Sequence, residues 1–413
     1  MLQPSVKQSE APAGAVSRQA WLMLTLATVG FAINFWAWAL LSPLGPRFKE
    51  SLDLSSFEQS LLVAVPVIVG SLGRIPVGAL TDRFGGRVMF PIVSAVTIVP
   101  VLFIGLAGHE SLAALLVGGF FLGISGTSFA VGVPVVSAWF PPERRGLAIG
   151  VFGVGMGGTA ISALTTVKLV DAHGMRTPFL ITAAVLAVFA VVSALLLRDA
   201  PDRTVPTEPL AHRLAATLRL GVTWQASALY AVAFGGYVAF SVYLPTYLKT
   251  GYGLEQADAA NRMAGFVLLA VAMRPVGGWL SDRMGAVRVL GGSLAVVVAG
   301  ALVQSLTPSL APVGTIAFLA MAAALGAASG AVFALVALLA PANKVGSVTG
   351  VVGAAGGLGG FVPPLVMGAL YGALSSYAIG LLLLAAVAAA ALAFTGTGVR
   401  QAVARRQVPV PSH

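Results

Sequence analysis

Hydrophobic stretches of about 20 residues recur along the whole chain, separated by short polar segments. A helix rises ~1.5 Å per residue, so each stretch is long enough to cross a hydrocarbon layer of ~30 Å. Unpaired backbone groups are costly in lipid, and the stretches therefore predict helices rather than irregular structure. Twelve spans are expected, at residues 21–43, 58–80, 88–107, 112–139, 147–169, 177–197, 223–247, 262–281, 288–307, 313–339, 347–372 and 376–396.

The composition supports the same class. Of 413 residues, 58% are hydrophobic and only 9% are charged, and the mean hydropathy is +0.93. Soluble domains carry about 25% charged residues. Cysteine is absent, so neither a disulfide framework nor a thiolate metal site is expected. The sequence predicts an all-α integral membrane protein, with the lipid bilayer as its surroundings.

The basic residues are distributed unevenly across the predicted spans. Sixteen of the 24 Lys and Arg residues fall on one side of a twelve-span topology and six on the other. Cytoplasmic loops carry such an excess, so both termini and the central loop are expected in the cytoplasm, with the spans in a bacterial inner membrane. The net charge of +10 then follows from topology, and no nucleic-acid partner is expected.

The chain reads as an internal duplication. One long polar connection leaves six spans on each side, and VGALTDRFG at 77–85 recurs as GGWLSDRMG at 277–285. Parallel six-helix repeats of this kind describe the major facilitator fold, two pseudo-symmetric bundles with a substrate site between them. The predicted parts are a first bundle at 1–197, a cytoplasmic central loop at 198–222, a second bundle at 223–399 and a cytoplasmic tail at 400–413.

The loop after the second span resembles the major facilitator signature Gly-x-x-x-Asp-Arg-x-Gly-x-Arg, with Asp82 and Arg83 at the charged positions. Asp282 and Arg283 hold the same positions in the second copy. We expect these residues to act in gating. Asp82 can lie at a neighbouring helix N-terminus or pair with Arg83, and such contacts can break as the halves move.

Two arginines interrupt the apolar sequence. Arg74 lies within 61–80 and Arg274 within 267–280. A guanidinium in hydrocarbon costs about 2.5–3.5 kcal/mol and keeps its proton, so two matched arginines need a function. Each precedes its cytoplasmic aspartate by eight residues, about 12 Å of helix, which puts both near the membrane midplane. Planar forked donors suit the oxygens of a small anion, and we expect the two to bind it together.

The chain resembles the nitrate/nitrite porter family of the major facilitators. The resemblance rests on the glycine-rich segments 346–363 and 150–159, and on the arginine pair. It implies that Arg74 and Arg274 hold nitrate or nitrite, and that Phe129, Tyr230 and Phe234 surround it. The family often carries Asn where this chain has Met156 and Ser329, and we expect Met156 to pack among its neighbouring glycines.

The glycine rows predict helix faces that come close together. Gly153 and Gly157 in the first half, and Gly353 and Gly357 in the second, are four residues apart and so share a face. Small residues at this spacing allow close helix approach, and glycine also weakens a helix. We expect these four glycines to contribute to conformational change.

The acidic residues and histidines indicate the mode of transport. All fourteen acids and all four histidines lie in loops or at span ends, so no span carries an obvious proton acceptor. Two uncompensated arginines should hinder an empty carrier from changing sides, which favours nitrate/nitrite exchange. Proton-coupled nitrate uptake remains an alternative if water or substrate carries the proton.

Other functions are also compatible with parts of the pattern. A facilitator for a small organic anion and a non-transporting sensor on the same fold both stay open. An enzyme is not expected, because the chain has no nucleophile–base set and no phosphate-binding loop. We expect no catalytic residues, metal or cofactor, and a monomer.

Overall fold

A computed structural model describes residues 16–201, 203, 205, 208–341 and 344–407. The described residues contain no strand, and twelve of their helical segments are long and apolar enough to cross a membrane. The spans are α1 (Arg18–Trp38), α3–α4 (Ser56–Leu72, Arg74–Phe84), α5 (Gly86–Leu106), α6–η2–α7 (Leu112–Leu122, Gly123–Thr127, Ser128–Trp139), α8–η3–α9 (Pro142–Gly153, Val154–Gly157, Gly158–His173), α10 (Arg176–Leu196), α12 (Gly221–Tyr252), α13 (Gln256–Met284), α14 (Ala286–Ser305), η4–α15 (Leu310–Gly314, Thr315–Leu339), α16–α17 (Val345–Gly359, Val362–Leu374) and α18–η6–α19 (Ala378–Phe394, Thr395–Val399, Arg400–Gln407). Three further helices lie in connections: α2 (Gly45–Ser51), η1 (Gly108–Glu110) and α11 (Leu210–Leu218).

All twelve predicted spans are present, with some boundaries shifted. The first span ends at Trp38 rather than 43, and α12 continues beyond 247 to Tyr252. The segment 400–413, expected as a tail, continues the last span as α19 as far as Gln407. Helix α11 lies within the connection expected as a loop. A hydropathy criterion misses these extensions because the added residues, such as 249–252, are mostly polar or charged.

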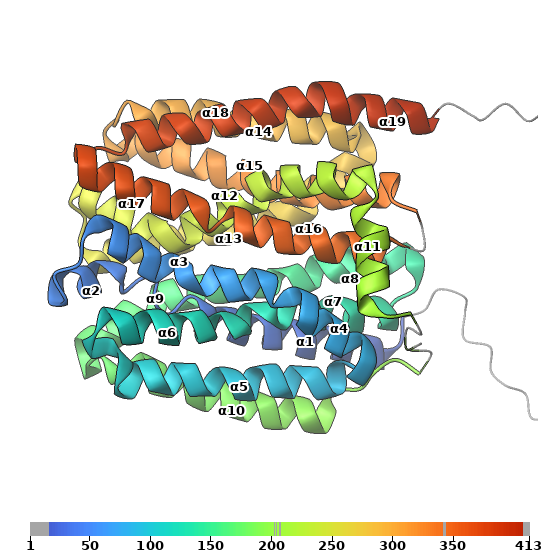
Figure 1. The fold of residues 1–413 in the computed structure, drawn as a ribbon, viewed down its shortest axis with the longest axis horizontal. Helices are drawn as coiled ribbons and strands as arrows, with labels where there is room; N and C mark the ends of the chain where they lie inside the picture. The colour runs from blue at the N-terminus through green and yellow to red at the C-terminus, as the bar shows by residue number, and fades with distance from the viewer. Residues whose placement is uncertain (1–15, 202, 204, 206–207, 342–343, 408–413) are drawn as a thin grey trace, which may run out of the picture.

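The chain forms two bundles that lie side by side. The first six spans, blue to green, fill the lower part of Figure 1, and the last six, yellow to red, fill the upper part. With twelve spans, α1 begins and α19 ends at the same end of the molecule (Figure 1). We call this the terminal end and the opposite one the distal end. Helix α11 lies across the terminal end, where it follows α10 and leads into α12.

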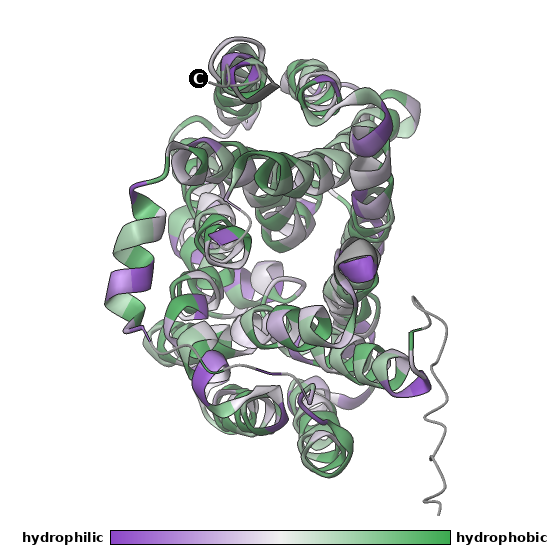
Figure 2. Ribbon diagram, turned by 90° about the vertical axis from the view of Figure 1, so that its right-hand side faces the viewer, coloured by the Kyte–Doolittle hydropathy of each residue, from purple (hydrophilic) through white to green (hydrophobic). Residues whose placement is uncertain are grey.

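The outer surface is apolar, as lipid contact requires. In the end-on view of Figure 2, hydrophobic residues colour most of the helices. Val99, Val188 and Leu195 are each more than 60% exposed, and many other large hydrophobic side chains are also exposed. An apolar surface of this extent would drive a water-soluble protein to aggregate, whereas in a bilayer it is solvated by acyl chains.

Close helix packing fixes the helix that carries Arg274. A Cβ added to Gly326 or Gly330 of α15 would collide with the backbone of α13, and one on Gly277 of α13 would collide with the backbone of α15. Small residues thus let these two backbones approach directly. Arg274 therefore projects from a helix whose position in the second half is tightly defined.

Candidate functional site: two arginines between the halves

Arg74 is buried where α3 gives way to α4. Helix α3 ends at Leu72 and α4 begins with Arg74, whose exposed fraction is 8%, and Gly73 between them keeps helical dihedral angles. Its Nη1 donates to the carbonyl of Gly353 at 2.8 Å, across the boundary between the halves. The guanidinium carbon lies 5.1 Å from the ring centroid of Phe129, a cation–π contact. Its Nε is buried and has no partner among the described residues.

Arg274 is half-buried in the middle of the unbroken helix α13. Its Nη2 donates to the hydroxyl of Tyr230 at 2.7 Å, and its Nη1 contacts the sulfur of Met156 from the first half. The guanidinium carbon is 5.1 Å from the centroid of Phe234. Arg274 therefore has more hydrogen-bonding partners than Arg74 and more access to solvent.

The two guanidinium groups converge on one aromatic ring. The ring centroid of Phe234 lies 5.8 Å from the guanidinium carbon of Arg74 and 5.1 Å from that of Arg274. The distance between the two guanidinium carbons therefore cannot exceed the sum of these two distances. Tyr230 stacks on Phe234 at 4.8 Å with an interplanar angle of 10°. The structure thus brings together all five residues predicted to bind the substrate, with Phe129 on the side of Arg74.

The site has positive charge without a compensating acid. No ion pair between described residues includes Arg74 or Arg274. Two like charges in a largely buried place repel one another, and each loses hydration. An anion between them would relieve both costs and would meet planar forked donors.

Met156 and Ser329 replace the family's frequent Asn, and the structure separates their roles. Met156 is 1% exposed, as packing among its neighbouring glycines requires, and its sulfur also contacts Arg274. Ser329 instead bonds to the carbonyl of Leu325 in its own helix, at 2.7 Å. The sequence contained a signal that Met156 lies near the site. The repeat offset of 200 residues pairs Met156 with Gly356, and a Cβ at Gly356 would collide with Tyr230.

The glycine rows behave differently in the two halves. A Cβ at Gly357 would collide with Ser71, as expected for close approach, and one at Gly353 would lie at ordinary distance, 3.6 Å, from Phe129. At Gly153 and Gly157 an added Cβ would meet nothing within 4 Å, so close packing there was a wrong prediction. The tight contacts of this segment come instead from its other face, through the glycines that abut α1, Gly155 and Gly158.

Asp82 is bonded to the connection between the two halves. Its carboxylate accepts from Arg213 of α11 at 2.7 Å, and its carbonyl accepts from Arg203 at 2.8 Å. A different acid lies at the N-terminus of α5: the carboxylate of Asp199 accepts from the amide of Gly86 at 2.7 Å. The expected partners of Asp82, a helix N-terminus or Arg83, were therefore wrong. Contacts with a distant connection leave no local pattern in the sequence.

The second copy of the motif lacks these contacts. Asp282 is exposed and takes part in none of the ion pairs found between described residues. Arg283 lies over the ring of Trp279 at 4.1 Å, as Arg83 does over Phe84 at 5.3 Å. The two copies of the motif are therefore alike in sequence but differ in the contacts that their aspartates make.

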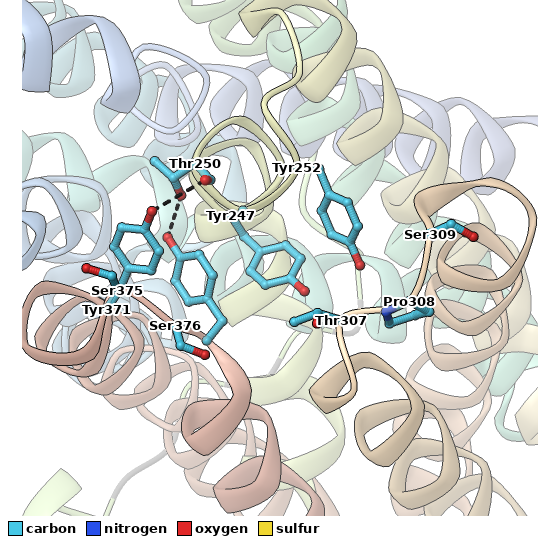
Figure 3. Close-up of a pocket in the computed structure, with 11 residues that line it drawn as sticks. Tyr247, Thr250, Tyr252, Thr307, Pro308, Ser309, Tyr371, Ser375 and Ser376 are labelled. Carbon is cyan, nitrogen blue, oxygen red and sulfur yellow. Dashed lines mark hydrogen bonds between the residues drawn. The ribbon is translucent and has the colours of Figure 1, made fainter.

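A separate cavity of about 450 Å³ lies at the distal end of the second half (Figure 3). It is lined by hydroxyl groups, and Thr250 bonds to the hydroxyls of Tyr371 and Tyr377. None of the lining residues forms a hydrogen bond or a ring contact with either arginine. Sequence reasoning did not predict this cavity, because its tyrosines come from α12, from α17 and from the residue that precedes α18, which are far apart in the chain.

Comparison with known proteins places the chain in a family. The model of the Major Facilitator Superfamily matches residues 27–364 and 261–411. A "Probable nitrate/nitrite transporter NarK2" of Mycobacterium tuberculosis (strain ATCC 25618 / H37Rv) is 51% identical over 382 residues, covering 92% of this chain and 97% of that protein. The chain belongs to the nitrate/nitrite porter family of the major facilitators. This family membership confirms the predicted fold class and a membrane transporter rather than an enzyme.

Other members of the family have related names. A "Nitrite extrusion protein" of Bacillus subtilis (strain 168) is 36% identical over 370 residues, covering 89% of this chain and 92% of the relative. The crystal structure of a bacterial homologue of the human lysosomal transporter Spinster, inward-facing and occupied, has a TM-score of 0.75. It covers 96% of this chain and 100% of its own at 19% identity, a likeness that concerns the fold.

Proposed function

We propose that this porter moves nitrate and nitrite across the membrane by alternating access, and that it exchanges one for the other. The single observation that carries the proposal is the pair of guanidinium groups, one from each half, at the same aromatic ring and without an acid. The names of the M. tuberculosis and B. subtilis relatives support these substrates.

Recognition would use both arginines at once. The buried Nε of Arg74 is a free donor, and Arg274 is oriented by the hydroxyl of Tyr230. Nitrate is flat, so its oxygens can accept in-plane from two guanidinium forks while Phe129 and Phe234 lie against it. Binding to groups of both halves makes the anion a bridge between the bundles.

Exchange follows from the charges at the site. Without an anion, the two arginines repel each other where the halves must come together, so the empty carrier should change sides slowly. A bound anion removes that barrier in either direction. Nitrate entering and nitrite leaving carry equal charge, so the cycle moves no net charge.

The orientation completes the proposal. The excess of basic residues at the terminal end supports an orientation in which that end, with both chain termini, faces the cytoplasm across a bacterial inner membrane. Each chain contains both arginines, so we propose that a monomer is the working unit.

Uptake into liposomes tests this proposal. Purified protein is reconstituted into liposomes loaded with nitrite, chloride, formate or no permeant anion, and entry of labelled nitrate is followed. We expect fast entry with internal nitrite, slow entry without a permeant anion, and no response to an imposed pH gradient.

Other outcomes would change the function. Rapid nitrate entry into empty liposomes, driven by inward protons, would replace exchange by proton-coupled uptake and keep the anion site. Failure of nitrate to enter under all conditions, with exchange of a small organic anion instead, would contradict the proposed substrates.

A further inference from the structure

Polar contacts join the two halves along the distal part of α12. Four of its residues, from Tyr237 to Lys249, reach groups of the first half. The contacts are Tyr237 with Thr159 (3.4 Å), the Val242 carbonyl with Ser42 (2.8 Å), Thr246 with Gln59 (3.0 Å) and Lys249 with Glu50 (2.6 Å). We call this set the α12 seam. It runs from the arginines to the distal end.

The innermost contact of the α12 seam adjoins the anion site. Tyr237 stacks on Phe234 at 5.7 Å with an interplanar angle of 20°, on the ring that both arginines approach. Tyr237 is 2% exposed and Thr159 is fully buried. The hydroxyl pair therefore lies beside the site, between it and the remaining contacts of the seam.

The hydrogen bond has a defined direction. Thr159 Oγ1 donates to the carbonyl of Met156 at 3.0 Å, so its lone pair accepts the O–H of Tyr237. The sulfur of Met156 contacts Arg274, and Arg274 lies over Phe234. These five residues form a closed ring of contacts. A movement of Arg274 upon anion binding would therefore be transmitted to the hydroxyl pair by two routes, through Met156 and through Phe234.

We propose that the contact between Tyr237 and Thr159 is the inner gate on the distal side of the anion site. It holds the halves together directly beside the anion and must break before the site opens to the distal end. This inference rests on the proposed function, since a gate needs alternating access. It assigns to Tyr237 and Thr159 a positioning role that the sequence pattern did not indicate.

The absence of cysteine from the sequence allows a direct measurement. Ser60→Cys introduces one thiol at a fully buried position of α3, against Gly368 of the other half, near the distal end. The protein is placed in lipid nanodiscs, and the rate of reaction with a water-soluble maleimide is measured. Because the thiol is covered while the distal side is closed, this rate reports opening of that side.

Two conservative changes remove the gate contact without removing the side chains. In the Ser60→Cys background, Tyr237→Phe keeps the ring stack and Thr159→Val keeps the shape. Each should raise the labelling rate about 2- to 10-fold, the effect of losing one neutral hydrogen bond. The double variant should label no faster than the faster single variant, because both changes remove the same contact.

A matched control is available on the same helix. Tyr252→Phe also removes a tyrosine hydroxyl from α12, but its partner, Gln304, lies within the second half. This variant should label at the parent rate. Labelling of Tyr237→Phe at the parent rate, or multiplied effects in the double variant, would overturn the gate.

Nitrate binding measured by calorimetry on the same samples separates the two proposals. If the parent binds nitrate and the gate variants label like the parent, the gate is wrong and the function stands. If the parent binds no nitrate, the proposed function fails, and the labelling rates still decide whether the contact controls distal opening.

Discussion

The two arginines have the same place in the sequence repeat and different surroundings in the structure. Arg74 is the first residue of α4, is 8% exposed, and uses one nitrogen on a backbone carbonyl. Arg274 lies in a continuous helix, is more exposed, and is held by Tyr230 and Met156. The repeat therefore keeps the charge at the matched position, whereas the surroundings of that charge differ between the two halves.

This difference suggests separate tasks for the two groups. Arg274 is oriented in advance by a tyrosine hydroxyl, so it can guide an arriving anion without reorganising. Arg74 retains a buried donor without a partner, and burying such a donor costs about 1–3 kcal/mol until it is satisfied. Under the proposed function we therefore expect the anion to gain most from Arg74, whose own hydrogen bond to the carbonyl of Gly353 already reaches the other half.

The largest expected effect comes from replacing the arginines by lysine. Arg74→Lys keeps the charge and loses the fork, and we expect nitrate affinity to fall about 100-fold or more. Arg274→Lys should also weaken binding severely, by about 10- to 100-fold, because Tyr230 and Phe234 still shape the site. Calorimetric titration of purified variants measures both.

The matched control for these variants is Arg288→Lys, whose guanidinium is exposed and bonds only to the carbonyl of Met284, at the end of the preceding helix. It should bind nitrate like the parent. Near-parental affinity of Arg74→Lys would show that bidentate recognition at that position is wrong. A larger loss for Arg274 than for Arg74 would reverse the assigned division of work.

A smaller effect is expected at Tyr230. Tyr230→Phe removes the acceptor of Arg274 and leaves the stack on Phe234 in place. A hydrogen bond to a charged group contributes about 1.5–3 kcal/mol, so nitrate affinity should fall about 10-fold, and by less than in Arg74→Lys. Competition binding with labelled nitrate measures this. An unchanged affinity would mean that Arg274 needs no orientation by Tyr230.

Met156 offers a test of selectivity. Met156→Asn places an amide where the sulfur contacts Arg274, and an amide donor favours oxyanions over halides. We expect the ratio of nitrate to chloride affinity to change a few-fold at normal yield of monodisperse protein. Ser329→Asn is the control, since its hydroxyl bonds within its own helix. A reduced yield with an unchanged ratio would return Met156 to a packing role.

The smallest effects are expected at the terminal end, where the halves also differ. Asp82→Asn removes an ion pair with Arg213 whose side chains are 27% and 26% exposed, so a change of about 2- to 5-fold in exchange rate is expected. Asp282→Asn should have no effect on the rate in the liposome assay. Equal effects of both changes would contradict the asymmetry of the two motifs.

The sequence was sufficient for the spans and for the central arginines, because both depend on a local signal. Hydrophobic length defines a span, and a charge inside it is conspicuous. The partners of Asp82 were not predictable, since Arg213 lies 131 positions away and no local pattern pairs the two residues. The glycine face was predicted wrongly in the first half because Gly155 and Gly158 also have helical spacing, and only packing against α1 distinguishes the two faces.

A structure of the protein with nitrate tests the central claim most directly. The account predicts one planar anion beside Phe234, with its oxygens about 2.7–3.1 Å from donors of both Arg74 and Arg274. Nitrate bound to only one of the two arginines, or in the distal cavity lined by Tyr371 and Tyr377, would contradict it.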